Sequence, residues 1–207
     1  DDALGFSLSK IILEGPKEKL DETENTQPSI FLASQSIYQI IKKETKVDLT
    51  KASFFAGHSL GEYSALAASK SLNFNQTIKL LKKRGKAMQS AVPKGEGGML
   101  AVLGIDIEKL NKILEDNASS YKCFIANDNS NGQIVLSGKN KDIESLILDL
   151  KKDSIKNIKL PVSAPFHCEL MRKATEVMRK EIEITEFKKP NNSIVSNVTS
   201  IETRDPL

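Results

Sequence analysis

The feature that most constrains this chain is a Gly-x-Ser-x-Gly pattern centred on Ser59. Residues 53–56, which precede it, are apolar and aromatic, as is typical of a short buried strand. Residues 60–68, which follow it, are rich in Leu and Ala, which favours a helix. Because the flanking glycines allow a tight turn, we expect Ser59 to sit in a strained backbone between strand and helix, with its hydroxyl exposed.

Two interpretations of this turn are open. In the functional one, Ser59 is a nucleophile, and the backbone N–H of Leu60 at the start of the helix stabilises an oxyanion formed beside it. In the structural one, Ser59 only caps the helix. The five-residue pattern alone is a weak signal, whereas the strand before it and the helix after it favour the nucleophile.

Composition argues against several classes of partner. The 207 residues carry a formal net charge of +3, with Lys and Glu scattered along the chain, so we expect neither nucleic acid nor a membrane surface as a partner. No apolar run is long enough to span a bilayer. The two cysteines, Cys123 and Cys168, lack metal-type spacing, which predicts reduced thiols, a cytoplasmic location and no metal site.

Two further helices are predicted in the N-terminal half. Residues 26–28, Thr-Gln-Pro, indicate a helix start, with Thr26 as the cap and Pro28 in the first turn. The second helix covers residues 74–90 and has an apolar face opposite a solvated face that carries Lys79, Lys82, Lys83 and Lys86.

Arg84 departs from the pattern of this second helix. It falls within the apolar arc, between Leu81 and Met88. A buried guanidinium is costly without a partner, and no acidic residue lies on this helix. Either Arg84 forms an ion pair with a distant Asp or Glu, or its planar guanidinium binds the carboxylate of a substrate.

The stretch after a glycine-rich hinge at residues 95–98 has its own order of elements. The predicted elements are strand 99–104, helix 106–116, strands 123–127 and 133–137, helix 141–152 and strand 155–160. This βαββαβ order is ferredoxin-like. We therefore predict an α/β fold in which residues 1–96 and 162–207 form the core and residues 97–161 form an inserted subdomain. Residues 193–197 are a candidate further strand of the core.

Only two histidines are available as a general base. His58 adjoins Ser59, and at a tight turn its side chain should project away from the hydroxyl. His167 lies on a proline-rich loop where the chain returns from the insert, a place where clefts commonly form. It is therefore either the base of a Ser–His pair that forms an acyl-enzyme, or a capping or surface histidine. No Asp or Glu in the sequence stands out as the third member of a catalytic triad, which would orient the histidine ring.

Arg84 helps to separate two kinds of serine enzyme. A simple esterase pocket needs no buried cation, whereas a dicarboxylic acyl group must have its free carboxylate paired when it leaves water. A bidentate arginine would also discriminate against plain acyl thioesters, because they would leave its charge unpaired.

Five stretches of the sequence together point to a known family. The first is Gly-His-Ser-Leu-Gly-Glu-Tyr at residues 57–63. The other four are Thr26-Gln27-Pro28, Arg84-Gly85-Lys86-x-Met88-Gln89, Asn127-x-Asn129 with Gly132-Gln133, and Pro161-Val162-Ser163-x-Pro165-x-His167. In order and spacing they resemble the malonyl-CoA:acyl carrier protein transacylases of bacterial fatty-acid synthesis, and the first is similar to the nucleophile motif of that family. The resemblance implies an α/β-hydrolase-like core with a parallel sheet, an inserted ferredoxin-like subdomain and an active site between them.

The resemblance also implies roles for particular residues. Ser59 would carry the malonyl group as an ester, His167 would be the base, Arg84 would bind the malonyl carboxylate, and Leu60 would give an oxyanion N–H. The implied pocket or cleft residues are Gln27, Met88, Asn129 and Val162. In this family a neutral backbone or amide group orients the histidine, which would explain the missing acid. The implied reaction moves malonyl from malonyl-CoA to the phosphopantetheine thiol of acyl carrier protein, with no cofactor or metal.

Phe166, which precedes His167, resembles the malonyl-selective pattern of related polyketide acyltransferases. A bulky ring there would crowd an α-methyl branch and so favour malonyl over methylmalonyl. The alternative is a phenylalanine that only packs in the core.

Two segments of the family pattern are not found in this sequence. They are a leading strand with a Gly-Gln-Gly-Ser-Gln loop, whose first glutamine contributes to the oxyanion hole, and a late glutamine that positions the histidine. We therefore expect that both ends of a longer protein are missing. Three alternatives stay open: a serine thioesterase or esterase on the same core, an acyltransferase that serves a polyketide synthase, and a non-catalytic carrier-protein docking module or inactive fragment.

Overall fold

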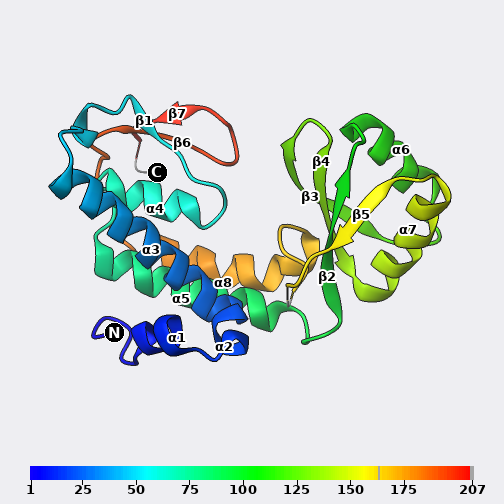
Figure 1. Cartoon of the computed structure of the whole chain (residues 1–207), viewed down its shortest axis with the longest axis horizontal. Helices are drawn as coiled ribbons and strands as arrows, with labels where there is room; N and C mark the ends of the chain where they lie inside the picture. The colour runs from blue at the N-terminus through cyan, green and yellow to red at the C-terminus, as the bar shows by residue number, and fades with distance from the viewer. Residues whose placement is uncertain (163, 206–207) are drawn as a thin grey trace. The chain divides into compact units, whose positions relative to one another are not determined.

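The chain divides into two compact units in a computed structural model that describes residues 1–162 and 164–205. The first unit contains Asp1–Lys86 and Met178–Leu207, and the second contains Ala87–Val177 (Figure 1). The second unit thus includes the predicted subdomain at 97–161 with flanking residues, and the predicted boundaries themselves stay a prediction. Ser163, part of the proline-rich motif, and residues 206–207 of the predicted core lie outside the described residues.

A small mixed sheet and several helices build the first unit. The helices are α1 (Leu8–Glu14), α2 (Lys17–Asp21), α3 (Thr23–Glu44), η1 (Leu49–Lys51), α4 (Gly61–Ala68) and most of α5 (Phe74–Ala91). The strands are β1 (Phe54–Phe55), β6 (Ser193–Val195) and β7 (Glu202–Thr203), in the order β1-β6-β7. Strand β1 runs parallel to β6, with Phe54 opposite Ser193, so the carboxyl ends of both strands lie at one edge.

The second unit has the predicted βαββαβ order. Its elements are β2 (Gly97–Leu103), α6 (Ile107–Asp116), β3 (Cys123–Ser130), β4 (Gln133–Lys139), α7 (Asn140–Lys152) and β5 (Lys156–Lys159), followed by η2 (Glu169–Met171) and the first part of α8 (Arg172–Glu183). The four strands form one antiparallel sheet in the order β3-β4-β2-β5. The expectation of an α/β fold that combines a parallel sheet with a ferredoxin-like subdomain is confirmed.

Alternate residues of β2 serve two different cores. Leu100 and Val102 are fully buried in the cluster that includes Leu146 of α7, because successive side chains of a strand point to opposite faces. Met99 and Ala101 face the other way, into a smaller cluster. The predicted glycine hinge is partly wrong, since Gly97 and Gly98 lie within β2 rather than before it. A Cβ on Gly97 would lie 2.3 Å from the Pro165 ring, so close packing requires this glycine.

Helix α3 begins earlier than the sequence predicts. Its first residue is Thr23, so Thr26 is not the cap, and Pro28 lies inside the helix. The Thr26 hydroxyl instead donates to the Leu20 carbonyl at 2.5 Å. The additional turn contacts α5, where Lys82 forms a salt bridge with Glu24 at 3.4 Å. The prediction that Lys82 lies on a solvated face is also wrong, because its side chain is 25% exposed.

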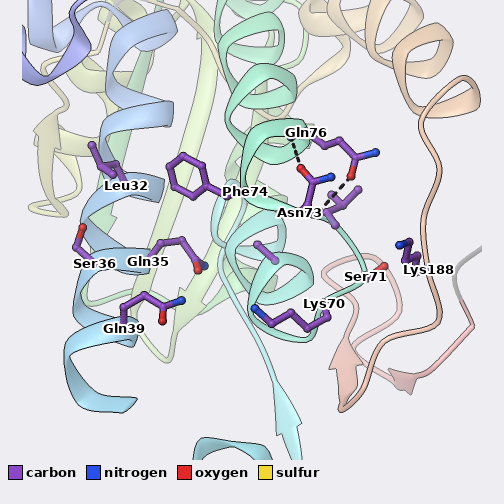
Figure 2. Close-up of a pocket in the computed structure, with 12 residues that line it drawn as sticks. Leu32, Gln35, Ser36, Gln39, Lys70, Ser71, Asn73, Phe74, Gln76 and Lys188 are labelled. Atoms are coloured by element: carbon purple, nitrogen blue, oxygen red, sulfur yellow. Dashed lines mark hydrogen bonds between the residues drawn. The ribbon is translucent and has the colours of Figure 1, made fainter. Parts of the chain in front are cut away.

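The predicted helix over residues 74–90 is confirmed as α5, and a reciprocal cap defines its start. The backbone N–H of Gln76 donates to Asn73 Oδ1 at 2.8 Å, and the backbone N–H of Asn73 donates to Gln76 Oε1 at 3.2 Å (Figure 2). This arrangement satisfies two N–H groups that a helix start otherwise leaves without partners. None of the described helices combines the length and apolar character that a bilayer crossing requires.

Gly85 lets α5 and α3 approach each other closely. A Cβ on Gly85 would lie 2.5 Å from both the Glu24 Cα and the Thr23 carbonyl oxygen, which are backbone atoms. This contact lies next to Arg84 on α5 and one helical turn before Gln27 on α3. The absence of a side chain at residue 85 therefore sets the separation of the two helices where Arg84 and Gln27 meet.

We expect Gly85→Ala to lower the free energy of unfolding by about 1–3 kcal/mol, since the added methyl group must displace backbone. Gly61→Ala is the control, because a Cβ there meets nothing within 4 Å. Urea denaturation of both variants measures the difference. Equal stability of the two variants would contradict the close approach.

Candidate active site

Ser59 lies in a backbone conformation that is unusual for a residue other than glycine. Strand β1 ends at Phe55 and α4 begins at Gly61, and the turn between them, residues 57–61, is called the elbow below. Ser59 has a φ of 55°, in the left-handed region. This conformation costs about 1–3 kcal/mol and persists only where surrounding contacts hold it. The expectation of a strained serine between strand and helix is therefore confirmed. The expectation of a buried strand over residues 53–56 is wrong, because β1 covers only two residues and Phe54 is 54% exposed.

Gly57 is the glycine that the elbow requires. A Cβ on Gly57 would lie 2.0 Å from the carbonyl oxygen of Gly61. Gly61 takes part only through its backbone, because a Cβ there would meet no atom within 4 Å. The flanking glycines were expected to allow the tight turn. The structure shows that Gly57 does so, whereas a side chain at residue 61 would meet no other atom.

Arg84 connects two other predicted site residues. Its Nη2 donates to Ser59 Oγ at 3.1 Å, and its Nη1 donates to Gln27 Oε1 at 2.6 Å. The Tyr63 ring lies 5.9 Å from the Arg84 Cζ, within the range of a cation–π contact. Three residues that the sequence separates widely are thus joined by one guanidinium in the first unit.

Arg84 lies near the acidic groups of Tyr63 and Glu62 but forms no salt bridge with a described residue of its unit. Burial lowers the pKa of the Arg84 guanidinium, while the nearby Tyr63 and Glu62 act in the opposite direction. Among the described residues of the first unit, Lys82 and Lys83 form salt bridges with Glu24 and Glu181, and Arg84 forms none. There the guanidinium is bound to neutral oxygens of an amide and a hydroxyl.

Leu60 occupies the residue before α4. Its backbone is helical, with φ −59° and ψ −24°, and its side chain packs against the cluster around Phe31. Among the described residues, no acceptor receives its N–H. An N–H group at the start of a helix is suited to stabilising negative charge that develops beside Ser59.

Asn197 also belongs to the elbow, and the sequence analysis missed it. That analysis placed it at the end of a predicted strand, whereas β6 ends at Val195. Its side chain accepts from the backbone N–H of Ser59 at 2.7 Å and donates to the Gly57 carbonyl at 2.7 Å. The signal in the sequence was an asparagine two residues after a short strand. Its role becomes clear once that strand is known to run parallel to β1.

His167 lies in the second unit, on a loop that several contacts hold. It is exposed and has a φ of 58°. The fully buried Ser137 on β4 donates its hydroxyl to the Phe166 carbonyl, and the Cys168 thiol donates to the Pro165 carbonyl at 3.2 Å. The backbone on both sides of His167 is therefore anchored.

The remaining predicted site residues also belong to the second unit. Val162 and Phe166 pack against the cluster of Met99, Ala101 and Val135, and Met88 is 7% exposed in a cluster with Met171. These contacts support the core-packing interpretation of Phe166, and its role in malonyl selectivity stays a prediction. Asn129 is exposed on β3. Among the described residues, no group of three or more His, Cys, Asp or Glu is placed to bind a metal ion.

The first unit also holds a pocket that the sequence analysis did not anticipate. It lies beside α3 and the start of α5 and has a volume of about 550 Å³. Figure 2 shows Gln35 and Gln39 of α3, Phe74 and Lys70 around it. Neither Ser59 nor Arg84 lines it, so it is distinct from the arrangement at the elbow.

The two cysteines of the second unit are free thiols whose pKa values are raised. Burial, with Asp142 and Cys168 adding to it, raises the pKa of Cys123 to about 12. Burial also raises the pKa of Cys168, although hydrogen bonds from backbone N–H groups partly lower it. Because a raised pKa favours the neutral thiol, Cys123 contributes stability below its unfolded pKa, near 9, that is lost as pH rises towards 12.

We expect iodoacetamide at pH 8 to alkylate Cys123 at least about a hundredfold more slowly in the native protein than in denaturant, because the thiolate is the reactive form. Peptide mass spectrometry over time measures both cysteines, and Cys168 should react faster than Cys123. Native alkylation of Cys123 at the denatured rate would contradict the raised pKa.

Comparisons with known proteins find relatives that are similar in sequence and in fold. A malonyl CoA-acyl carrier protein transacylase of Haemophilus influenzae is 38% identical over 198 residues, which is 95% of this chain and 63% of that protein. The crystal structure of an acyl-carrier-protein-S-malonyltransferase from Bartonella henselae superposes with a TM-score of 0.93 at 40% identity, over 100% of this chain and 66% of that one. A structure described as a type II PKS acyl-carrier protein in complex with its malonyl-transacylase also superposes, with a TM-score of 0.92 at 35% identity. The match covers 99% of this chain and 66% of the chain in that structure.

The chain therefore spans slightly less than two thirds of the length of these relatives. The acyl transferase domain family matches residues 1–206, nearly the whole chain. Together with the strained serine and the arginine beside it, this match shows that the chain belongs to the acyl transferase domain family.

Proposed function

We propose that this protein transfers a malonyl group from malonyl-CoA to the phosphopantetheine thiol of acyl carrier protein, in fatty-acid biosynthesis. The observation that carries the proposal is the 3.1 Å contact between Arg84 Nη2 and Ser59 Oγ, made by a guanidinium that forms no salt bridge with any described residue of its unit. In a malonyl ester the free carboxylate lies only two carbon–carbon bonds from the ester carbonyl carbon. A cation this close to Ser59 Oγ is therefore within reach of that carboxylate.

In the first step, the Ser59 hydroxyl attacks the thioester carbon while His167 accepts the hydroxyl proton. The Leu60 N–H stabilises the oxyanion of the tetrahedral intermediate. The carbon–sulfur bond then breaks, the imidazolium returns the proton to the coenzyme A sulfur, and the malonyl group remains as an ester on Ser59. Arg84 binds the malonyl carboxylate with both nitrogens of its fork, and Gln27 orients the fork.

In the second step, His167 accepts the proton of the phosphopantetheine thiol, and the sulfur attacks the ester carbon. The carbon–oxygen bond breaks, and Ser59 regains its proton from the imidazolium. Met88, Asn129, Val162 and Phe166 belong to this proposal as pocket residues. A cytoplasmic location and the absence of a cofactor are part of the same proposal.

Service to a polyketide synthase is a second candidate. This candidate is supported by a similar chain, 35% identical, whose structure was solved in complex with a type II PKS acyl-carrier protein. The chemistry at Ser59 would be the same, so acyl transfer assayed with carrier proteins of the two pathways distinguishes the candidates.

We expect the full-length protein incubated with malonyl-CoA to gain one malonyl group, and Ser59→Ala to gain none, because the ester forms on the Ser59 oxygen. Intact-mass spectrometry measures the adduct. Rapid hydrolysis of the ester by water without a carrier would instead favour a thioesterase. Binding of acyl carrier protein without any adduct would favour a docking module.

We expect Arg84→Ala to lower kcat/KM for malonyl-CoA by about 100-fold or more, since the loss of a charge-assisted bidentate pair costs about 3 kcal/mol. The rate with acetyl-CoA should be unchanged or higher, because acetyl has no carboxylate to pair. Lys83→Ala, one residue earlier on α5, is the control. An equal loss for both substrates would remove the carboxylate role of Arg84.

A further inference from the structure

A single asparagine side chain joins the two sides of the elbow. Asn197 Oδ1 accepts from the Ser59 backbone N–H, and its Nδ2 donates to the Gly57 carbonyl, each at 2.7 Å. Both bonds span well over a hundred residues of sequence, so they belong to the tertiary structure. The amide satisfies the backbone groups on either side of His58 as a neighbouring strand would.

The position of Asn197 follows from the parallel pairing of β1 and β6. Ser193 and Ile194 are paired with Phe54 and Phe55, so both chains leave the sheet at the same edge. Asn197 lies two residues beyond β6, and Gly57 lies two residues beyond β1. The register of the sheet therefore places Asn197 next to the elbow.

A third bond fixes the asparagine itself. Its backbone N–H donates to Glu62 Oε1 at 3.3 Å, and Glu62 lies in the first turn of α4. Asn197 is thus tied to the start of the helix as well as to the elbow. Only one orientation of the amide serves both Ser59 and Gly57, because the oxygen must accept and the nitrogen must donate.

We propose that Asn197 is a positioning residue for the nucleophile, which holds Ser59 in its left-handed conformation and so directs the hydroxyl towards the acyl group. Strained backbone at a functional site persists only where its surroundings over-determine it, and two short hydrogen bonds from one side chain do this here. The inference rests on the proposed function, because it requires that Ser59 is acylated.

Asn192 provides a matched control at the other end of β6. It precedes β6, and its Nδ2 donates to the carbonyls of Thr50 and Ala52 at 3.1 and 2.7 Å, before β1 begins. It also joins two distant segments, but it lies at the end of the sheet away from the elbow. Asn192→Ala therefore removes a comparable structural contact without touching Ser59.

The test is the rate of Ser59 acylation by malonyl-CoA in the full-length protein, measured by rapid quench and intact mass at saturating and limiting substrate. We expect Asn197→Ala to lower the saturating rate about tenfold or more while KM changes little. Asn197→Asp, which keeps the shape but sets a carboxylate oxygen against the Gly57 carbonyl, should also lose rate. Asn192→Ala should keep the wild-type rate per folded molecule, with folded fractions taken from urea denaturation.

Wild-type acylation separates failure of this inference from failure of the proposed function. If the wild type is acylated and both Asn197 variants react at its rate, the positioning role is overturned and the proposed function stands. If Asn192→Ala loses as much rate as Asn197→Ala, the effect is general destabilisation and the inference is again overturned. If the wild type forms no adduct, both fail.

Discussion

The hydrogen bond from the Arg84 guanidinium to the Ser59 hydroxyl is the interaction on which the rest of the site depends. A half-buried cation without a carboxylate would usually be a liability, because its desolvation is not offset by an opposite charge. Here neutral oxygens of Gln27 and Ser59 accept its hydrogen bonds. Neutral partners leave the positive charge available, so an incoming carboxylate can form charge-assisted hydrogen bonds with the guanidinium.

The fold supplies this arrangement by two close approaches of backbone. Gly85 allows α5 to contact the start of α3, which brings Arg84 and Gln27 within hydrogen-bonding distance. Gly57 allows the chain to turn back on Gly61, which places Ser59 ahead of α4. The left-handed backbone of Ser59 is strained. Two hydrogen bonds from Asn197, which follows the neighbouring strand β6, offset this strain.

Much of the fold could be predicted because periodicity and turn chemistry are local. The strand, elbow and helix around Ser59, helix α5 and the βαββαβ order all follow from patterns within short windows. The out-of-phase position of Arg84 marked it as unusual without any structure. The start of α3 was missed because a tertiary contact at Gly85 supports the additional turn, and propensity does not report such contacts.

The partners of the candidate site were harder to predict than its members. Ser59 and Arg84 were found from motif and periodicity, but their direct hydrogen bond depends on how α3, α4 and α5 pack. Asn197 was missed because its role depends on the parallel register of β1 and β6, which two-residue and three-residue strands do not reveal in sequence. The structure shows that the Phe166 ring packs against buried neighbours. The role of Phe166 in malonyl selectivity stays a prediction.

The most direct measurement is a crystal structure of the full-length protein carrying the malonyl ester. The account predicts that the ester lies on Ser59 Oγ and that the two oxygens of the free carboxylate lie within hydrogen-bonding distance of Arg84 Nη1 and Nη2. A malonyl carboxylate bound by another cation or left in solvent, with Arg84 still donating to Gln27 and the Ser59 oxygen, would contradict it.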